Sequence, residues 1–502
     1  MIAPSGFVLA GTRSGVGKTS LALGIMGALA RRGHVVAPFK VGPDYIDPTY
    51  HASVCGRPSH NLDTWLMEPD EAVAVFERSV ARVAREAAGA QTQANRAEIV
   101  QAPPLGGPST TGRPGAVSST HALGLVAVVE GVMGLFDGLA GGGERCSTGE
   151  MAKLLGLPVV LVIDCSHTAR SAAAVVHGFR TFDPDLLIAG VILNKVAGPG
   201  HGRMVEEALA ELASPPPVLG IVPRRSALHL ESRHLGLIPT VEDRGVADVL
   251  ERIIDHVEEH VDLDSLLTGA APVDPGSGGM RDAPRSNRHS GAEPRSRVAI
   301  ARDGAFSFYY QDNFDVLEEE GAELHFFSPV AGDRLPSGCD AVYLGGGYPE
   351  VYAAELAANS GLGRDLSAAI AAGVRVYAEC GGYLYLGREI ENGDGVHTMA
   401  GVLPTRASMS GARLRMGYVE ATACERHPLS GAGFRGHLFH YSATTGSEHP
   451  AYEVSRKGET LADGYADDHL VASYVHLHFR GSRRMARWLA LGVTSQEDHT
   501  HA

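Results

Sequence analysis

The sequence predicts two α/β domains, each built on a mainly parallel sheet. Short apolar runs alternate with helical patterns in both halves of the chain, which is typical of parallel strands covered by helices on both faces. Between the halves, residues 268–297 are rich in Gly, Pro, Ser and Arg and hold few large apolar side chains. Such a segment buries too little surface to offset its ordering entropy, so we expect a flexible linker.

These patterns predict a first domain at 1–267, the linker at 268–297 and a second domain at 298–502. A polar, Gly- and Pro-containing stretch at about 88–119 is expected to be a disordered insertion in the first domain. The strands expected in the first domain are 7–10, 35–40, 125–130, 158–164 and 190–195. Those expected in the second domain are 297–302, 323–327, 340–344, 374–379 and 470–478.

Composition narrows the class of protein. The formal net charge of −15 argues against nonspecific binding to nucleic acid or to an anionic membrane. An anionic small-molecule substrate stays possible, because a local basic pocket can oppose the overall field. The six cysteines include no C-x-x-C pair, which favours reduced thiols over a disulfide framework or a zinc site. No apolar stretch approaches the roughly 20 residues of a membrane span, and the N-terminus reads as a strand rather than a signal peptide. We expect a cytoplasmic protein.

A phosphate-binding loop follows the first strand. Gly11–Ser20 reads GTRSGVGKTS, and Lys18 begins a helix that is expected to continue to about Arg31. In this strand–loop–helix setting, backbone N–H groups and the helix N-terminus surround phosphate oxygens. The residues expected to contact ATP are Gly15, Val16, Gly17, Lys18 and Thr19.

Within this loop, we expect Lys18 to contact the β- and γ-phosphates and Thr19 to hold Mg²⁺. The spacing G-T-x-x-x-x-G-K-T resembles the dethiobiotin synthetase-like branch of P-loop enzymes. Arg13 stands where partitioning ATPases of the deviant-loop type usually have a signature lysine.

Acidic residues follow two expected strands of the same sheet. Glu130 ends the apolar run LGLVAVVEG, and Asp44 and Asp47 lie in FKVGPDYIDP. Ligands of open parallel sheets bind beyond the carboxyl ends of the strands, so these acids should converge on the phosphates. Mg²⁺ prefers one or two carboxylates plus phosphate oxygens, and we expect Glu130 and Asp44 to serve it, with Asp137 of GVMGLFDG in the same set.

Asn194 ends another expected strand, GVILNK. Its amide is suited to the adenine edge, because it offers both a donor and an acceptor, and equally suited to capping the next helix or turn. The sequence leaves both interpretations open.

A strand-to-helix elbow carries a candidate nucleophile in the second domain. Cys380 follows an expected strand in YAECGGYLYL, and the small residues after it permit the sharp turn that lifts a nucleophile above a sheet. The backbone N–H groups expected to form an oxyanion hole belong to Gly381 and to Gly346 and Gly347 of LGGGY. An inert buried cysteine is the alternative.

His476 in SYVHLHF is the expected base for Cys380. Many class I glutamine amidotransferases have a glutamate two residues after this histidine, but His478 stands there, on the same face of the expected strand. The sequence therefore predicts a Cys–His dyad without the usual orienting acid.

Taken together, the two halves resemble the cobyrinic acid (hydrogenobyrinic acid) a,c-diamide synthase family. The segments that carry this resemblance are FKVGPDYIDP, VVEGVMGLFDG, ARDGAFSFYYQDN, LGGGYPE, AECGGYLYL and SYVHLHF. The resemblance implies a P-loop, dethiobiotin synthetase-like parallel-sheet domain followed by a class I glutamine amidotransferase-like α/β domain. It also implies a carbon–nitrogen ligase of cobalamin biosynthesis that uses ATP, Mg²⁺ and glutamine to amidate the a and c acetates of a tetrapyrrole through an acyl phosphate.

For individual residues, the resemblance implies that Asp44, Glu130 and Asp137 serve Mg²⁺ and the phosphoryl centre, and that Tyr45 and Ile46 border the substrate. Two alternatives stay open: a nickel-sirohydrochlorin a,c-diamide synthase, and a P-loop switch ATPase with an inactive amidotransferase-like domain. The sequence also leaves open the metal in the macrocycle and the oligomeric state, for which a homodimer is one option.

Overall fold

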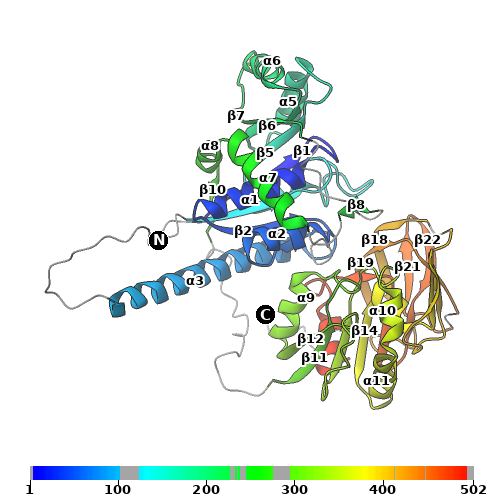
Figure 1. Ribbon diagram of the computed structural model, residues 1–502. Coiled ribbons are helices and arrows are strands. Elements are labelled where there is room, and N and C mark those ends of the chain that lie inside the picture. Colours follow the sequence, from blue (N-terminus) through cyan, green and yellow to red (C-terminus); the bar gives the residue numbers. More distant parts are fainter. Residues whose placement is uncertain are drawn as a thin grey trace. The chain divides into compact units, whose positions relative to one another are not determined.

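The computed structural model describes residues 4–101, 124–225, 232–233, 236–237, 245–274, 294–411, 413–446 and 448–494. Contacts between residues divide it into two compact units, each with its own hydrophobic core (Figure 1). The first unit combines the described residues up to Leu62, within 73–237 and from Gly245 to Asp274. The second unit combines Asp63–Ala72 with the described residues from Pro294 onward.

The first unit is built on an eight-stranded sheet with the order β3-β2-β4-β1-β5-β6-β7, in which all neighbours are parallel. Its strands are β1 (Ser5–Gly11), β2 (Val35–Val41), β3 (His60–Leu62), β4 (Leu125–Glu130), β5 (Val159–Asp164), β6 (Ile188–Val196) and β7 (Val218–Pro223). The eighth strand, β10 (Ala271–Pro272), pairs antiparallel with β1, while β8 (Ser232–Arg233) and β9 (Gly236–Leu237) form a separate ribbon.

Helices connect these strands and cover the sheet. They are α1 (Lys18–Arg31), α2 (Asp47–Cys55), α3 (Pro69–Gln101), α4 (Thr148–Leu155), α5 (Ser171–Phe182), α6 (Pro199–Ala210), α7 (Val246–His260) and α8 (Leu263–Thr268). Helix α1 packs closely against α7, as Figure 1 shows. Two glycines of α1, Gly24 and Gly27, permit this approach, because a Cβ at either would fall within 2.4 Å of an α7 side chain.

The second unit contains a six-stranded sheet with the order β12-β11-β13-β14-β24-β23, in which only β23 is antiparallel to its neighbour. Its strands are β11 (Ser296–Ala301), β12 (Ala322–Phe327), β13 (Ala341–Leu344), β14 (Arg375–Glu379), β23 (Tyr465–Ala466) and β24 (Leu470–Ser473). The helices of this unit are α9 (Gln311–Glu319), α10 (Ala353–Ala358), α11 (Ser360–Ala371), α12 (Gly381–Leu386) and α13 (Arg483–Leu491).

Two smaller sheets follow the elbow helix α12. One has the order β16-β15-β17-β20 and contains β15 (Glu389–Asn392), β16 (Gly395–Thr398), β17 (Arg406–Ser408) and β20 (Ala443–Thr445). The other has the order β22-β21-β18-β19-β25 and contains β18 (Arg415–Ala423), β19 (Gly433–His440), β21 (Tyr452–Arg456), β22 (Glu459–Asp463) and β25 (His476–Leu477). Apart from β25, which lies within the expected strand 470–478, the sequence analysis did not identify these strands.

The expected two-part α/β architecture is confirmed, but one expected strand is wrong. Residues 470–478 do not form a single strand, because β24 ends at Ser473 and β25 joins another sheet. Side chains take the backbone donors at the break: Asp463 accepts from the N–H of Tyr474 at 2.9 Å, and Ser473 accepts from the N–H of Val475 at 3.0 Å. Two polar side chains, the local Ser473 and Asp463 from β22, therefore end a strand that its apolar composition favours.

Parts of the two segments expected to be disordered form helix or strand in the structure. Where disorder was expected from residue 88, α3 continues to Gln101 through a stretch rich in the helix formers Ala and Gln, and the bounds of the insertion stay a prediction. Residues 102–119 lie outside the described residues. At the ends of the expected linker, Ala271–Pro272 pairs with β1 and β11 begins at Ser296, whereas residues 275–293 lie outside the described residues.

The close packing of α1 on α7 leads to a stability prediction. In Gly24→Ala the new Cβ would lie 2.3 Å from Cγ2 and 2.8 Å from Cβ of Val257. We expect the free energy of unfolding to fall by about 1–3 kcal/mol, as for other overpacked sites. The matched control is Gly178→Ala in helix α5, where a Cβ meets open space; it should raise stability by about 0.5–1 kcal/mol. Denaturant unfolding followed by circular dichroism compares the two, and equal stabilities would contradict this account of the packing.

Candidate active sites

The phosphate loop lies between β1 and α1. Gly15 and Gly17 have φ of +76° and +95°, values that L side chains rarely adopt, and Gly17 forms the N-cap of α1. Lys18 begins the helix, as the sequence predicted. Its ammonium donates to the carbonyl oxygen of Met133, and its pKa is lowered to about 8 by burial and by the nearby charge of Lys40. A bound anion at the loop would stabilise the charged form of Lys18, which burial and Lys40 disfavour.

Two residues at the end of β6 brace this loop. Asn194 Nδ2 donates to the carbonyl oxygen of Val16 at 2.8 Å, and a Cβ on Gly17 would lie 2.4 Å from the same nitrogen. Lys195 Nζ donates to the carbonyl oxygen of Gly15 at 2.6 Å and to Asp164 Oδ2 at 3.1 Å. The Asn194 side chain thus holds the loop backbone, a role that the sequence did not reveal, and its contact with adenine stays a prediction.

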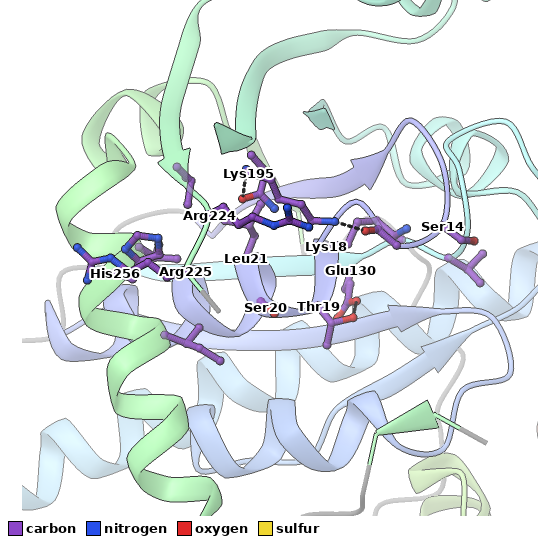
Figure 2. A pocket seen from close by; sticks show the side chains of 18 of the residues that line it. Ser14, Lys18, Thr19, Ser20, Leu21, Glu130, Lys195, Arg224, Arg225 and His256 are labelled. Carbon is purple, nitrogen blue, oxygen red and sulfur yellow. Dashed lines mark hydrogen bonds between the residues drawn. The ribbon is translucent and has the colours of Figure 1, made fainter. Parts of the chain in front are cut away.

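A cavity of about 940 Å³ opens beside the loop. Its walls come from the loop and α1, from the ends of β2, β4 and β6, and from Val222–Arg225 and α7. Five basic side chains line it, against two acidic ones: Lys18, Lys40, Lys195, Arg224 and Arg225 against Asp44 and Glu130. Figure 2 shows Thr19 and Glu130 in one part of the cavity and Arg225 with His256 in another. The cavity is therefore a local basic pocket in an acidic protein, large enough for a nucleotide.

A buried cluster of charged side chains forms the floor below the loop. Glu130 has no exposed surface; its Oε1 accepts from Thr19 Oγ1 at 2.7 Å and from Lys40 Nζ at 2.9 Å. Its Oε2 lies 2.7 Å from His51 Nε2. Asp47 Oδ2 lies 2.6 Å from Lys40 Nζ and 3.3 Å from Thr19 Oγ1. Helix α1, helix α2 and strands β2 and β4 therefore converge on one polar centre.

The positive charge in this cluster stabilises the ionised form of Glu130 but not that of Asp47. Burial alone would raise the pKa of Glu130, but Lys40 and His51 lower it below its ordinary value. Burial also lowers the pKa of Lys40, yet Asp47 and Glu130 outweigh this and raise it overall. The pKa of Asp47 is raised well above its ordinary value by burial and by the neighbouring Asp44. A site that disfavours a second carboxylate charge is one where a bound cation would be stabilised.

The other acids predicted for Mg²⁺ have local partners. Asp44 Oδ1 accepts from the backbone N–H groups of Ile46 and Asp47 at 2.8 and 2.9 Å, at the start of α2. Asp137 Oδ2 accepts from the N–H of Gly134 at 3.0 Å within its own loop. Asp47, which the sequence analysis noted without a role, contacts Thr19 directly, whereas Asp44 borders the cavity. Their metal roles stay predictions.

The oxygens of Thr19, Asp47 and Glu130 fit a magnesium ion by their chemistry. All three are hard oxygen donors, and Thr19 Oγ1 lies within hydrogen-bonding distance of both carboxylates beside the phosphate loop. Tyr45 and Ile46, predicted to border the substrate, are only 3% and 4% exposed, so their substrate contact stays a prediction.

Cys380 forms the strained elbow that the sequence predicted, between β14 and α12. Its φ of 44° and ψ of −99° lie in a region that non-glycine residues rarely occupy. Its backbone N–H donates to the carbonyl oxygen of Ser473 at 2.7 Å, and its Sγ lies 3.6 Å from the carbonyl oxygen of Phe439. Burial and the charge of Glu350 raise the pKa of the thiol, while the N–H of Gly381 opposes this. The thiol thus needs a base to become nucleophilic.

The predicted oxyanion glycines gather at this elbow. A Cβ on Gly381 would lie 3.0 Å from the backbone nitrogen of Gly347, and a Cβ on Gly346 would lie 2.4 Å from Cε1 of His476. Gly347 has φ of +151°, and a Cβ there would fall 2.2 Å from the carbonyl oxygen of Ala305. The loop after β13 therefore passes closely between the elbow and His476, which only glycine permits. Their roles as oxyanion donors stay predictions.

His476 lies next to a carboxylate and against Gly346 of the loop that follows β13. Its side chain is fully buried, and it is paired with His437 in the register of β25 and β19. Its Nδ1 lies 3.7 Å from Oε2 of Glu379, the residue before Cys380. His478 has a different neighbour, because its Nε2 lies 3.8 Å from Asp312 Oδ2.

Sequence reasoning assigned no role to Lys40, His51 or Glu379. Lys40 is the last residue but one of the apolar strand β2, and Glu379 ends β14; charged residues at such strand ends are a signal that the sequence contains. His51 follows the FKVGPDYIDP segment on α2, and no spacing rule distinguishes it from an ordinary helical histidine.

Comparison with known proteins assigns a family model to each half of the chain. A model of the CobQ/CobB/MinD/ParA nucleotide binding domain matches residues 7–238, and a model of the CobB/CobQ-like glutamine amidotransferase domain matches residues 297–484. The chain is therefore an amide-forming ligase that binds a nucleotide and uses glutamine.

Relatives define the family. A cobyrinate a,c-diamide synthase of Dehalococcoides mccartyi is 38% identical over 96% of both chains. That of Syntrophotalea carbinolica is 40% identical over 96% of both chains. A hydrogenobyrinate a,c-diamide synthase of Brucella abortus is 40% identical over 88% of this chain and 90% of its own. The chain belongs to the family of cobyrinate and hydrogenobyrinate a,c-diamide synthases.

Among the helices of the described residues, none combines the length and the apolar character required to span a membrane.

The buried cluster predicts a large cost for losing its cation. Lys40→Met would leave Glu130 and Asp47 buried without Lys40, and we expect the free energy of unfolding to fall by about 3–5 kcal/mol. The control is Lys153→Met, which also removes a lysine that contacts two carboxylates, Glu144 and Asp183, but near the surface. It should cost about 0–1 kcal/mol. Equal losses in denaturant unfolding would show that Lys40 does not stabilise the cluster.

Proposed function

We propose that this protein amidates the a and c acetate carboxylates of cobyrinic or hydrogenobyrinic acid in cobalamin biosynthesis, with ATP and glutamine as co-substrates. The observation that carries the proposal is the presence of a phosphate loop over a buried acid cluster and of a strained cysteine elbow on one chain. A relative named as a cobyrinate a,c-diamide synthase matches 96% of this chain, and one named as a hydrogenobyrinate a,c-diamide synthase matches 88% of it. The proposal also includes a cytoplasmic location and small-molecule partners without nucleic acid; a homodimer stays a prediction.

In the first unit, the proposed reaction makes a carboxylate reactive. A carboxylate is a poor electrophile, so its oxygen attacks the γ-phosphorus of ATP, ADP leaves, and an acyl phosphate forms. Lys18 and the backbone of Gly15 and Gly17 hold the phosphates in line, which is most of what phosphoryl transfer requires. Arg224 and Arg225 add positive charge at the cavity wall. A magnesium ion held by Thr19, Asp47 and Glu130 would neutralise charge on the β- and γ-phosphates.

In the second unit, the proposed reaction releases ammonia. His476 takes the proton of the Cys380 thiol, and the thiolate attacks the side-chain amide carbon of glutamine. The resulting oxyanion is stabilised by backbone N–H groups near Gly347 and Gly381. His476 then donates the proton to the leaving nitrogen, the C–N bond breaks, and water hydrolyses the thioester to glutamate. Ammonia finally attacks the acyl phosphate, and phosphate leaves.

The two alternatives predict different substrates. A nickel-sirohydrochlorin a,c-diamide synthase would use the same two sites on another macrocycle, and a switch ATPase would leave glutamine unchanged. The names of the relatives favour cobyrinic and hydrogenobyrinic acids, and the strained Cys380 backbone favours an active glutaminase. Assays with these acids and nickel sirohydrochlorin, with amides counted by mass spectrometry, separate the three proposals.

A double-label experiment tests the proposed chemistry. The protein is incubated with ATP, [amide-¹⁵N]glutamine and cobyrinic or hydrogenobyrinic acid that carries ¹⁸O in its carboxylates. We expect ¹⁵N in each new amide and one ¹⁸O in inorganic phosphate for each amide, because the attacking carboxylate oxygen leaves with the phosphate. Mass spectrometry of both products is the measurement. Amides without ¹⁵N would contradict the function, and ¹⁵N amides with unlabelled phosphate would contradict only the acyl phosphate.

The control for this experiment is Cys380→Ala. Its amides should contain no nitrogen from glutamine, while ammonium at high concentration should still yield amides and ¹⁸O-labelled phosphate. Loss of the ammonium-dependent reaction in a folded variant would contradict the separation of the two sites.

The geometry of the acid cluster distinguishes two proposed metal ligands. We expect Asp47→Asn to raise the Mg²⁺ concentration for half-maximal activity by about tenfold or more, because Asp47 contacts Thr19 Oγ1. Asp44→Asn should have a smaller effect, because Asp44 caps the start of α2. Mg²⁺ titrations of ammonium-dependent amidation measure both, and a larger shift for Asp44→Asn would reverse the assignment.

A further inference from the structure

Many class I glutamine amidotransferases have an orienting glutamate two residues after the catalytic histidine, and this chain has a histidine at that position. The residue two after His476 is His478, and its Nε2 lies 3.8 Å from Asp312. Its ring lies against Tyr310, with 4.8 Å between the ring centroids. His478 therefore supplies no negative charge to His476.

A carboxylate reaches His476 from another strand. Glu379 ends β14, directly before Cys380, and is 1% exposed. Its Oε2 lies 3.7 Å from Nδ1 of the fully buried His476. Strand β14 is paired in parallel with β24, and Glu379 is the register partner of Ser473. The strand that ends in the nucleophile thus also ends in an acid beside the base.

Three donors hold the Glu379 carboxylate in place. The hydroxyl of Tyr343 donates to Oε2 at 2.8 Å, and the hydroxyl of Tyr377 donates to Oε1 at 2.7 Å. The backbone N–H of Leu477 also donates to Oε1, at 2.8 Å. Together these three hydrogen bonds fix the orientation of the carboxylate. Because Leu477 follows His476, the same carboxylate fixes the backbone of the histidine and faces its ring.

We propose that Glu379 is the positioning residue for His476, so that the glutaminase uses a Cys–His–Glu arrangement whose acid immediately precedes the nucleophile. The inference rests on the roles proposed above for Cys380 and His476. A carboxylate at Nδ1 keeps the proton on that nitrogen and leaves Nε2 free to accept the proton of the thiol. It also stabilises the imidazolium that forms. The 3.7 Å separation shortens when glutamine binds, as catalytic hydrogen bonds do.

Other titratable groups face this pair from neighbouring elements, and the pH test has to take them into account. They are Cys380, Tyr309, Tyr343, Tyr377, Tyr452, His437 and His440. Burial lowers the pKa of His437 to about 3 and that of His440 to about 4, so both are neutral near pH 7. Burial also keeps the tyrosines protonated. Glu379 is the carboxylate that faces Nδ1 of His476, at 3.7 Å.

The first test compares Glu379→Gln and Glu379→Asp in the full-length protein. For Glu379→Gln we expect kcat of glutamine hydrolysis to fall about 10²–10⁴-fold, as when the acid of a triad is neutralised. The KM for glutamine should change less than about threefold, because the lost interaction acts on the base. Glu379→Asp should recover part of kcat. Amidation with ammonium should be unchanged in both variants, which reports an intact fold.

The pH profile separates positioning from a merely structural role. Without the carboxylate, the imidazolium is less favoured, so the acid limb of kcat/KM should move to lower pH by about one unit or more in Glu379→Gln. A kcat within threefold of the parent, with an unchanged pH profile, would overturn the proposal. Normal glutamine hydrolysis by Cys380→Ala would instead overturn the proposed function on which this inference rests.

A second measurement decides the matter if Glu379→Gln does not fold. In the parent protein, ¹⁵N-histidine spectra near pH 7 report which ring nitrogen of His476 is protonated, and His476→Gln identifies its signals. We expect the Nδ1–H tautomer, because Glu379 faces Nδ1. The Nε2–H tautomer would contradict the proposal, since Nδ1 would then carry no proton for the carboxylate.

Discussion

Both candidate sites depend on one constraint: the carboxyl ends of neighbouring parallel strands meet at the same edge of a sheet. In the first unit the register pairs Lys40 with Glu130, although 90 positions separate them in the sequence. In the second unit it pairs Glu379 with Ser473, the residue whose carbonyl holds the backbone of Cys380. Strand pairing thus brings the reactive groups together, and the loops after each strand need only complete the site.

Buried charge is the second common feature, and each site balances it differently. Glu130 is surrounded by donors of Lys40, His51 and Thr19, which keep it ionised. The ionised form of Asp47 is disfavoured by burial and by the neighbouring Asp44. Glu379 has neutral donors and one histidine. The first arrangement suits a site that receives a cation and a polyanion together. The second suits a site where a positive charge appears on a side chain during the reaction.

The sequence identified the parts whose signal is local. The phosphate loop, the cysteine elbow and most parallel strands follow from apolar runs and from glycines at fixed offsets. It did not identify what depends on register or on distant side chains. Lys40 and His51 join the acids Asp47 and Glu130 in one cluster only when β2, β4 and α2 are in place. Likewise, the break after Ser473 depends on Asp463, which lies on another strand and accepts from Tyr474. Periodicity alone does not encode such partners.

The central claim is that the phosphoryl chemistry of the first unit and the nitrogen chemistry of the second unit act on one carboxylate. The most direct test is the stoichiometry of the complete reaction, with ADP, glutamate and macrocyclic amide quantified in the same samples over time. We expect one ADP and one glutamate for each amide formed, with little ADP when the macrocycle is omitted. Equal ADP formation with and without the macrocycle, or glutamate release unrelated to amide formation, would contradict it.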